Sequence, residues 1–154
     1  MLARDLRIAL FSGNYNYVRD GANQALNNLM ASALAAGASV RVYSPTIDPP
    51  AFEPAGDLVS VPSWSMPGGR GEYRLARGLS SQVRADLAAY KPNIVHVSAP
   101  DILGHRALSW ARKSGIPCVA SLHTRFETYP RYYGLAFIEP LLVRMQTRFY
   151  NRAD

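Results

Sequence analysis

A strand, a glycine-bearing loop and a helix follow one another near the start of the chain, and this order constrains the fold most strongly. Residues 7–11 form a short apolar run that is typical of a buried strand. Residues 12–20 form a polar loop that contains Gly13. From Gly21 onward apolar residues recur at steps of three and four, which predicts a helix over residues 21–36 that ends at Gly37. The order predicts a β-α unit.

The N-terminus of this helix is a candidate anion site. Its unpaired backbone N–H groups and the positive end of its dipole favour a phosphate. The alternative is an ordinary β-α turn in which Asp20 caps the helix, and the sequence leaves both interpretations open. Gly13 and Gly21 are eight residues apart, so there is no G-x-G-x-x-G, and no G-x-x-x-x-G-K-[ST] is present. We therefore expect neither a standard dinucleotide site nor a P-loop nucleotide hydrolase.

Strands and helices are predicted to alternate along the rest of the chain. The predicted strands cover residues 40–44, 58–61, 93–97 and 117–122, and the predicted helices cover residues 72–90, 102–114 and 136–152. Between them, residues 62–71 form a long loop rich in Pro, Ser and Gly, which is typical of a functional segment. This alternation predicts one α/β domain, a doubly wound parallel sheet of Rossmann-like form. The run at 117–122 is apolar enough to predict a central strand.

Ligands of a doubly wound sheet bind outside the carboxyl ends of the strands. The predicted strands bring four segments to that edge: residues 12–21, 62–71, 96–101 and 123–125. His123 ends a strand there, and polar Thr124 and Arg125 follow it, so we expect His123 to face a substrate. For His96, inside a strand, the favoured interpretation is a satisfied core histidine and the alternative is a functional one. Asp101 is a carboxylate candidate by position only.

Arginine dominates the positive charge of the chain. The formal net charge is +6 and the pI about 9.8, which favours phosphates, acidic lipid headgroups or nucleic acid as partners. Arg74, Arg77 and Arg84 fall on one face of the helix predicted over 72–90, beside the loop that carries Trp64. The simpler interpretation is a solvated helix face, and the other is peripheral contact with an anionic membrane.

Composition excludes several other classes. Hydrophobic residues make up 48% of the chain, enough for a real core, and no run approaches the roughly 18 apolar residues of a membrane span. Cys118 is the only cysteine, so neither a disulfide framework nor a metal cluster is expected. We interpret Cys118 as a core residue, and a single buried thiol fits a reducing cytoplasm. Nucleic-acid binding is disfavoured because no helix-turn-helix, RNP-type sheet or zinc framework is present.

Eight segments of the chain together form a recognisable pattern. In chain order they are residues 7–12 (RIALFS), 20–22 (DGA), 91–97 (KPNIVHV), 107–112 (ALSWAR), 115–117 (GIP), 120–126 (ASLHTRF), 131–135 (RYYGL) and 151–154 (NRAD). By these segments the chain resembles, across its length, the N-terminal domain of retaining GT-B glycosyltransferases of family 4. It is similar to the bacterial mannosyl- and glucosyltransferases and the plant-type sulfolipid synthases. Asn93 stands where such proteins often carry aspartate.

The resemblance implies that residues 1–154 are the acceptor-side half of a two-domain enzyme whose donor-binding half is absent from this sequence. The enzyme would move a hexose from a nucleotide-diphosphate sugar to a lipid or glycan acceptor, with retention and with no metal or other cofactor. Gly21, with Asp20 beside it, would approach the donor's phosphates. His123 would contact the transferred sugar as the catalytic residue of this half. The substrate-side residues would be His96, Asp101, Thr124 and Arg125.

The expected location is the cytoplasm, at the inner face of the membrane if the arginines bind lipid. The polar tail at 152–154 falls where the next buried strand is expected, which suggests a fragment or a truncated form. The chain alone is therefore expected to be inactive. The alternative function is a non-catalytic Rossmann-like module that binds an anionic ligand or a protein partner.

Overall fold

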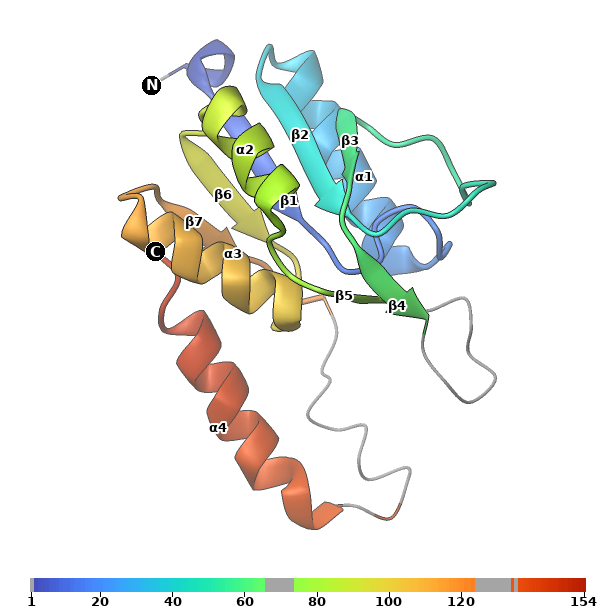
Figure 1. Cartoon of the computed structure of the whole chain (residues 1–154), viewed down its shortest axis with the longest axis vertical. Helices are drawn as coiled ribbons and strands as arrows, with labels where there is room; N and C mark the ends of the chain where they lie inside the picture. Colours follow the sequence, from blue (N-terminus) through green and yellow to red (C-terminus); the bar gives the residue numbers. More distant parts are fainter. Residues whose placement is uncertain (1, 66–73, 124–133, 135) are drawn as a thin grey trace.

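Five parallel strands form the central sheet of the protein, seen here in a computed structural model that describes residues 2–65, 74–123, 134 and 136–154. Their order across the sheet is β3-β2-β1-β6-β7 (Figure 1). All four neighbouring pairs are parallel, so every carboxyl end meets the same edge. The doubly wound, Rossmann-like α/β fold is thus confirmed. The strands are β1 (Arg7–Phe11), β2 (Ser39–Ser44), β3 (Asp57–Ser60), β6 (Ile94–Val97) and β7 (Cys118–Ala120).

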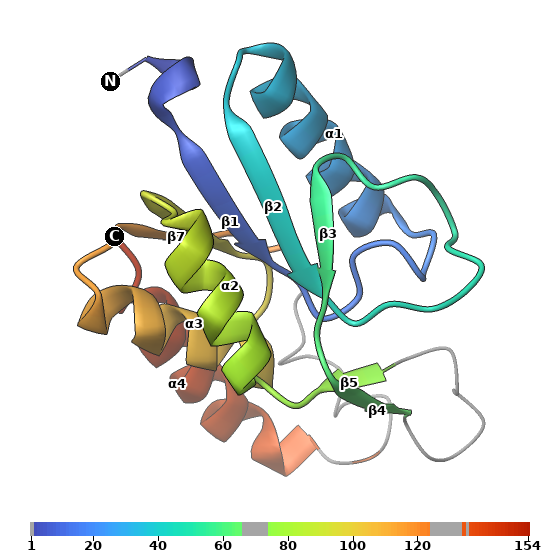
Figure 2. The same cartoon turned by 45° about the horizontal axis from the view of Figure 1, so that its top comes forward.

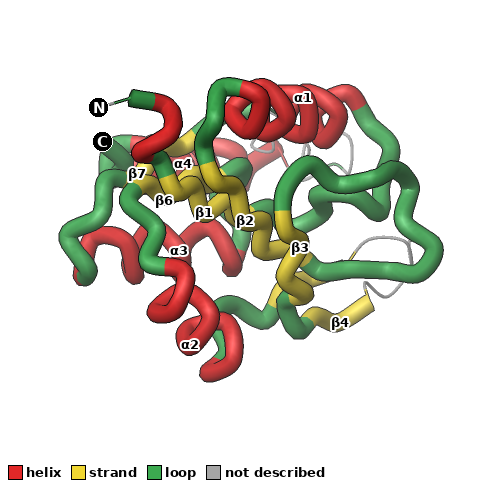
Figure 3. Tube along the Cα trace, turned by 90° about the horizontal axis from the view of Figure 1, so that it is seen from above, coloured by secondary structure: helices red, strands yellow, loops and turns green. Residues whose placement is uncertain are grey.

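Helices cover both faces of the sheet. Helix α1 (Gly21–Ala35) lies on one face, and α2 (Ser81–Tyr90) and α3 (Ile102–Lys113) lie on the other (Figure 3). Side chains of a strand alternate between faces, so β1 feeds two cores: Ile8 and Leu10 pack on the α1 side, and Ala9 and Phe11 pack on the α2–α3 side. Because β1 has neighbours on both edges and is covered on both faces, it is the central strand.

A fourth helix, α4 (Glu139–Tyr150), follows a short 3-10 turn, η3 (Ala136–Ile138), and extends away from the sheet towards the bottom of Figure 1. The C-terminal end of α4 packs against the rest of the domain. Phe149 is 1% exposed and meets the ring of His105 in α3, with 4.7 Å between the ring centroids. In the part of the chain that the structure describes, no helix is both long enough and apolar enough to cross a membrane.

The helix predicted over residues 72–90 is wrong in its first half. Residues Ser63–Ser65 (β4) and Arg74–Ala76 (β5) form a separate antiparallel hairpin, and α2 begins only at Ser81. Gly78 has a φ of +92°, which a helix does not allow, and the Ser80 side chain caps α2 by accepting from Val83 N–H. Gly78 and Ser80 therefore prevent a helix from extending further back, and the described residues before them pair as strands instead.

The prediction that the strand around 117–122 is central is also wrong. Within the described residues β7 covers only Cys118–Ala120 and is the outer strand next to β6. Val119 on this strand is 41% exposed. On its outer side, Asp154 N–H donates to the carbonyl of Cys118 at 2.9 Å. The apolar run therefore indicated a strand, but neither its burial on both faces nor its place in the sheet.

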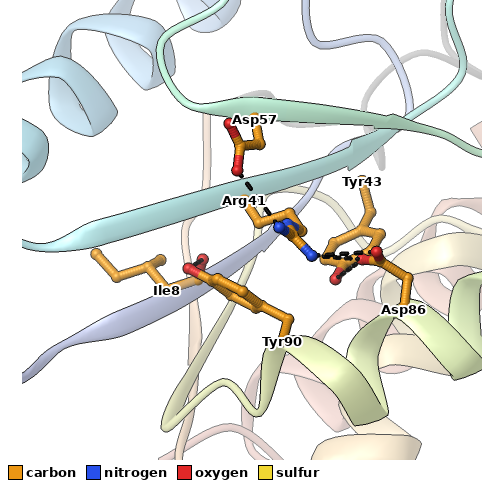
Figure 4. Close-up of polar contacts among 6 residues, drawn as sticks. All are labelled: Ile8, Arg41, Tyr43, Asp57, Asp86 and Tyr90. Atoms are coloured by element: carbon orange, nitrogen blue, oxygen red, sulfur yellow. Dashed lines mark hydrogen bonds and ion pairs between the residues drawn. The ribbon is translucent and has the colours of Figure 1, made fainter.

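A polar cluster that sequence reasoning missed fastens α2 to the sheet (Figure 4). The Arg41 guanidinium on β2 donates to both carboxylate oxygens of Asp86 in α2, at 3.1 and 3.2 Å, and also reaches Asp57 at 3.4 Å. The Tyr43 hydroxyl donates to Asp86 at 2.7 Å, and Arg41 lies 4.5 Å from the centroid of the Tyr90 ring. This cluster fixes the position of α2, and it lies along the strands rather than at their carboxyl edge.

Candidate functional site

The carboxyl edge of the sheet gathers the exits of β1, β6 and β7, and the β4–β5 hairpin stands beyond the ends of β1, β2 and β3 (Figure 2). The sequence prediction that these segments meet at one edge is confirmed for the residues described. Thr124 and Arg125, predicted to be on the substrate side, lie outside the described residues. The other residues predicted to contact the donor or substrate fall into three groups: the β1–α1 loop, the end of β6 with the loop after it, and the residues after β7.

The loop after β1 is held firmly by its own aromatic residues. Tyr15 is fully buried; its backbone N–H donates to Ser44 Oγ at 3.1 Å and its hydroxyl donates to Asn27 Oδ1 at 2.7 Å. Burial raises the pKa of Tyr15 to about 12, so the phenol stays protonated. The Tyr17 hydroxyl donates to the carbonyl of Gly13 at 2.7 Å. These contacts of Tyr15 and Tyr17 fix the conformation of the loop that leads into α1.

The start of α1 is capped by Asp20. One carboxylate oxygen accepts from Asn23 N–H at 2.8 Å and the other from the Asn23 side-chain amide at 3.2 Å, so the cap interpretation is confirmed. A Cβ added at Gly21 would meet no atom of the described residues within 4 Å, and Gly21 is not in the left-handed region. Packing within the described chain therefore gives no reason for a glycine here. Gly21 itself is exposed.

The loop after β6 is packed tightly instead. Asp101 caps α3 by accepting from Gly104 N–H at 2.6 Å. A Cβ at Gly104 would collide with the Ala99 carbonyl, and a Cβ at Gly13 would collide with the Asp101 carboxylate. Burial raises the pKa of Asp101 above its ordinary value, against the opposing effect of the N–H donors at Gly104 and Leu103. Asp101 therefore joins the two loops at this edge.

Two histidines stand at the ends of β6 and β7 in different surroundings. His96 is 8% exposed, and a hydrogen bond of 2.9 Å joins its Nε2 to Ser121 Oγ, so the favoured interpretation as a satisfied core histidine is confirmed. Burial, and secondarily the charge of nearby His123, lowers the pKa of His96 to about 4. His123 is exposed at the edge, where a substrate could reach it.

The arginines that the sequence placed on one helix face are divided among three places. Arg74 is on β5 and its Nε donates to Ser63 Oγ at 2.7 Å, while the Arg77 guanidinium lies 4.7 Å from the Trp64 ring centroid. Only Arg84 is on α2, where its Nε donates to the carbonyl of Leu79 at 3.2 Å. The shared helix face is a wrong prediction, but Trp64 and Arg77 do form an exposed aromatic–cation pair.

The described residues contain neither a metal-binding cluster nor an exposed thiol. Within residues 2–65, 74–123, 134 and 136–154 no group of three His, Cys, Asp or Glu side chains could hold a metal ion. Cys118 is buried, and burial followed by the charge of Asp154 raises its pKa to about 11. It stays a protonated thiol in the core, as the sequence predicted.

The fold and its ligand edge define a Rossmann-like α/β domain with an open, capped helix N-terminus after the central strand. Residues 19–154 match the model of Glycosyltransferase Family 4, which covers most of the chain. The chain therefore belongs to glycosyltransferase family 4, and its five-stranded parallel sheet is consistent with one half of a GT-B fold.

Three curated proteins illustrate what the chain is similar to. It is 29% identical over 128 residues to the alpha-monoglucosyldiacylglycerol synthase of Acholeplasma laidlawii, covering 82% of this chain and 32% of that protein. It is 34% identical over 80 residues to the sulfoquinovosyl transferase SQD2 of Arabidopsis thaliana (51% and 15% covered). It is 29% identical over 68 residues to a GDP-mannose-dependent alpha-mannosyltransferase of Mycolicibacterium smegmatis (44% and 18% covered). The chain thus spans about a third or less of these relatives.

Proposed function

We propose that this chain is the acceptor-side, N-terminal half of a retaining glycosyltransferase that moves a hexose from a nucleotide-diphosphate sugar to a lipid or glycan acceptor. Membership of glycosyltransferase family 4 carries this proposal. One of the similar proteins is, by name, an alpha-monoglucosyldiacylglycerol synthase, which favours a lipid acceptor. The donor-binding half would be a second α/β domain outside these 154 residues.

At the start of α1, the proposed role of the chain is to receive the donor's diphosphate. Backbone N–H groups and the helix dipole stabilise negative charge there, and this effect grows as the leaving diphosphate develops charge. The open space at Gly21 supports this role, because a side chain would occupy the approach. Asp20 orders the helix end through its two bonds to Asn23, so its contribution is to position the N–H groups.

At the end of β7, the proposed role of His123 is a hydrogen bond to the transferred sugar. Its exposure at the ligand edge supports this role. Asp101, Thr124 and Arg125 are proposed to contribute on the same substrate side. Asp101 does so by holding the two loops together, as its contacts with Gly104 and Gly13 favour.

The test is the His123→Ala variant of the complete protein, assayed with nucleotide-diphosphate hexoses and a diacylglycerol acceptor. One lost hydrogen bond of about 1–3 kcal/mol corresponds to a fall in kcat/KM of about ten- to a hundred-fold. Since the side chain is exposed, the melting temperature is expected to stay unchanged. Residues 1–154 alone are the negative control, with no turnover expected. Sugar-nucleotide binding without turnover by the complete protein would favour the non-catalytic module instead.

Peripheral contact with an anionic membrane, at the inner face of the cell membrane, is part of this proposal. The support is the exposed pair of Trp64 on β4 and Arg77 just after β5, with Arg74 on β5 and Arg84 on α2. Each arginine near an anionic surface contributes about 1 kcal/mol. Flotation with anionic vesicles is expected to show salt-sensitive binding. Equal binding to neutral vesicles would contradict the electrostatic part of the proposal.

A further inference from the structure

A partly buried hydrogen bond joins the end of β6 to the residue that follows β7, two positions before the exposed His123. His96 Nε2 and Ser121 Oγ are 2.9 Å apart, although the residues are separated by 25 positions in the chain. His96 lies opposite Val119 in the register of β6 and β7, one position before the last pair, Val97 and Ala120, after which Ser121 follows. The bond thus spans the point at which β7 leaves the sheet.

Ser121 is held from three directions. Its N–H donates to the carbonyl of Val97 at 3.0 Å, its carbonyl accepts from the Tyr150 hydroxyl at 3.3 Å, and its own hydroxyl meets His96. Leu122 and His123, which follow, are both exposed. Contacts from both β6 and α4 therefore hold Ser121 in place, two residues before His123.

We propose that His96 is a positioning residue: through its hydrogen bond to Ser121 it fixes the direction in which the chain leaves β7, and thereby places His123 at the ligand edge. The inference rests on the proposed function for the role of His123 itself. The His96–Ser121 contact and its effect on the exit of β7 stand on the geometry alone.

The state of His96 suits a permanent positioning bond. Burial lowers the pKa of His96 to about 4, so the imidazole stays neutral near neutral pH and the bond to the Ser121 hydroxyl is present throughout. A charged imidazole at this place would also repel a protonated His123, which is the second cause of the lowered pKa. With 8% exposure, His96 has little access to a substrate, so its effect passes through Ser121.

Four variants of the complete protein separate this role from simple core packing. His96→Leu keeps most of the side-chain volume and removes the hydrogen bond. His96→Gln places an amide nitrogen near the position of Nε2 and can restore the bond. Ser121→Ala removes the partner with little change in the core, which keeps the test valid if His96→Leu fails to fold. Val119→Ala is the matched control, since Val119 lies opposite His96 but takes no part in the bond.

The first readout is hydrogen exchange of the backbone amides of residues 121–123, which needs no transferase activity. We expect exchange at least about tenfold faster in His96→Leu and Ser121→Ala, and near the original rate in His96→Gln and Val119→Ala. Unchanged exchange at residues 121–123 in Ser121→Ala would overturn the inference. An acceleration spread evenly over the whole sheet would also overturn it, because that result indicates core packing only.

The second readout is steady-state kinetics. His96→Leu and Ser121→Ala are each expected to lower kcat about tenfold with little change in KM, and the double variant to be no worse than either single one, because both remove one bond. Additive losses would overturn the inference. If the complete protein transfers no sugar at all while exchange at 121–123 still responds, the proposed function fails and the positioning bond stands.

Discussion

Two helix N-termini follow neighbouring strands on opposite faces of the sheet (Figure 3), and they have similar caps but different surroundings. Helices α1 and α3 follow the neighbouring strands β1 and β6, and each begins with an aspartate cap. Asp20 accepts from Asn23 N–H at 2.8 Å, and Asp101 accepts from Gly104 N–H at 2.6 Å. The difference lies in the glycines. A Cβ at Gly21 meets nothing within 4 Å, whereas a Cβ at Gly104 collides with the Ala99 carbonyl.

The comparison teaches that a glycine near a helix start has two separate physical meanings. At α3 the glycine is a packing requirement, because the helix lies directly on its own entry loop. At α1 no neighbour in the described chain requires it, which is why the proposal places the donor's phosphates at this end. An aspartate close to a glycine is found at both ends in the sequence, and only the three-dimensional surroundings distinguish the two.

The largest effect is expected from Gly104→Val. The valine must displace a backbone carbonyl beside fully buried Leu103 and Ala107, so we expect a loss of about 4 kcal/mol in unfolding free energy, above the usual overpacking range. Urea unfolding of the purified protein measures it. Gly21→Val is the matched control and is expected to change stability by less than about 0.5 kcal/mol. Equal losses in the two variants would remove the distinction between the helix ends.

The next largest effect is expected from acid, which should lower the free energy of unfolding through His96. His96 has a pKa of about 4 in the folded protein and about 6.5 when unfolded, so between these values the unfolded chain binds more protons. Stability is therefore complete above pH 6.5 and falls as the pH drops towards 4, by up to about 3 kcal/mol. His105, with a pKa lowered by burial, acts in the same direction, and the raised pKa of Asp101 opposes it.

Denaturant midpoints at pH 7 and pH 4.5 measure this acid effect. The His96→Gln variant is the control, since it has no imidazole to protonate and should lose most of the difference between the two pH values. A wild-type protein equally stable at both would contradict the burial of a neutral His96.

A smaller effect is expected from Gly13→Ala, which tests the contact between the two loops. The added methyl group must push the Asp101 carboxylate away, and a lost helix cap costs about 1–2 kcal/mol. In a double-mutant cycle, Asp101→Ala already lacks the carboxylate, so Gly13→Ala should then cost little more. Thermal unfolding of the four proteins measures the coupling. Fully additive losses would mean that Gly13 and Asp101 act independently.

The sequence predicted best those elements whose signals lie within a few neighbouring residues. The strand at residues 7–11 and the helix from Gly21 to the glycine stop at Gly37 were predicted within a residue, since period and cap are local. The hairpin before α2 was missed because Leu75, Leu79 and Val83 keep a helical spacing, while Gly78 and Ser80 break the helix. There the left-handed backbone of Gly78 and the helix cap at Ser80 outweighed the helical spacing of the apolar residues.

The strand order and the contacts between residues far apart in the chain were not predicted, for a different reason. The position of β7 at the outside of the described sheet depends on which strands pair, and an apolar run carries no such information. The His96–Ser121 bond joins residues 25 positions apart, and the Arg41–Asp86 contact joins residues 45 positions apart. For the candidate site, the sequence predicted the carboxyl edge at which the described segments meet, but not which side chains there are held by hydrogen bonds; the roles of the site residues stay predictions.

The smallest expected change in stability, and the most informative one for function, is that of Gly21→Val. The site of the new side chain is empty space, so the fold and the Asp20 cap should both persist. If the donor's diphosphate lies against this helix end, the branched side chain blocks it, and the complete protein should lose at least about tenfold in kcat/KM, or about 1.4 kcal/mol. Isothermal titration with the nucleoside diphosphate measures the same loss without turnover. Wild-type kinetics in a variant of unchanged melting temperature would mean that the open end of α1 takes no phosphate, and the search for the donor contact would then move to the residues around His123.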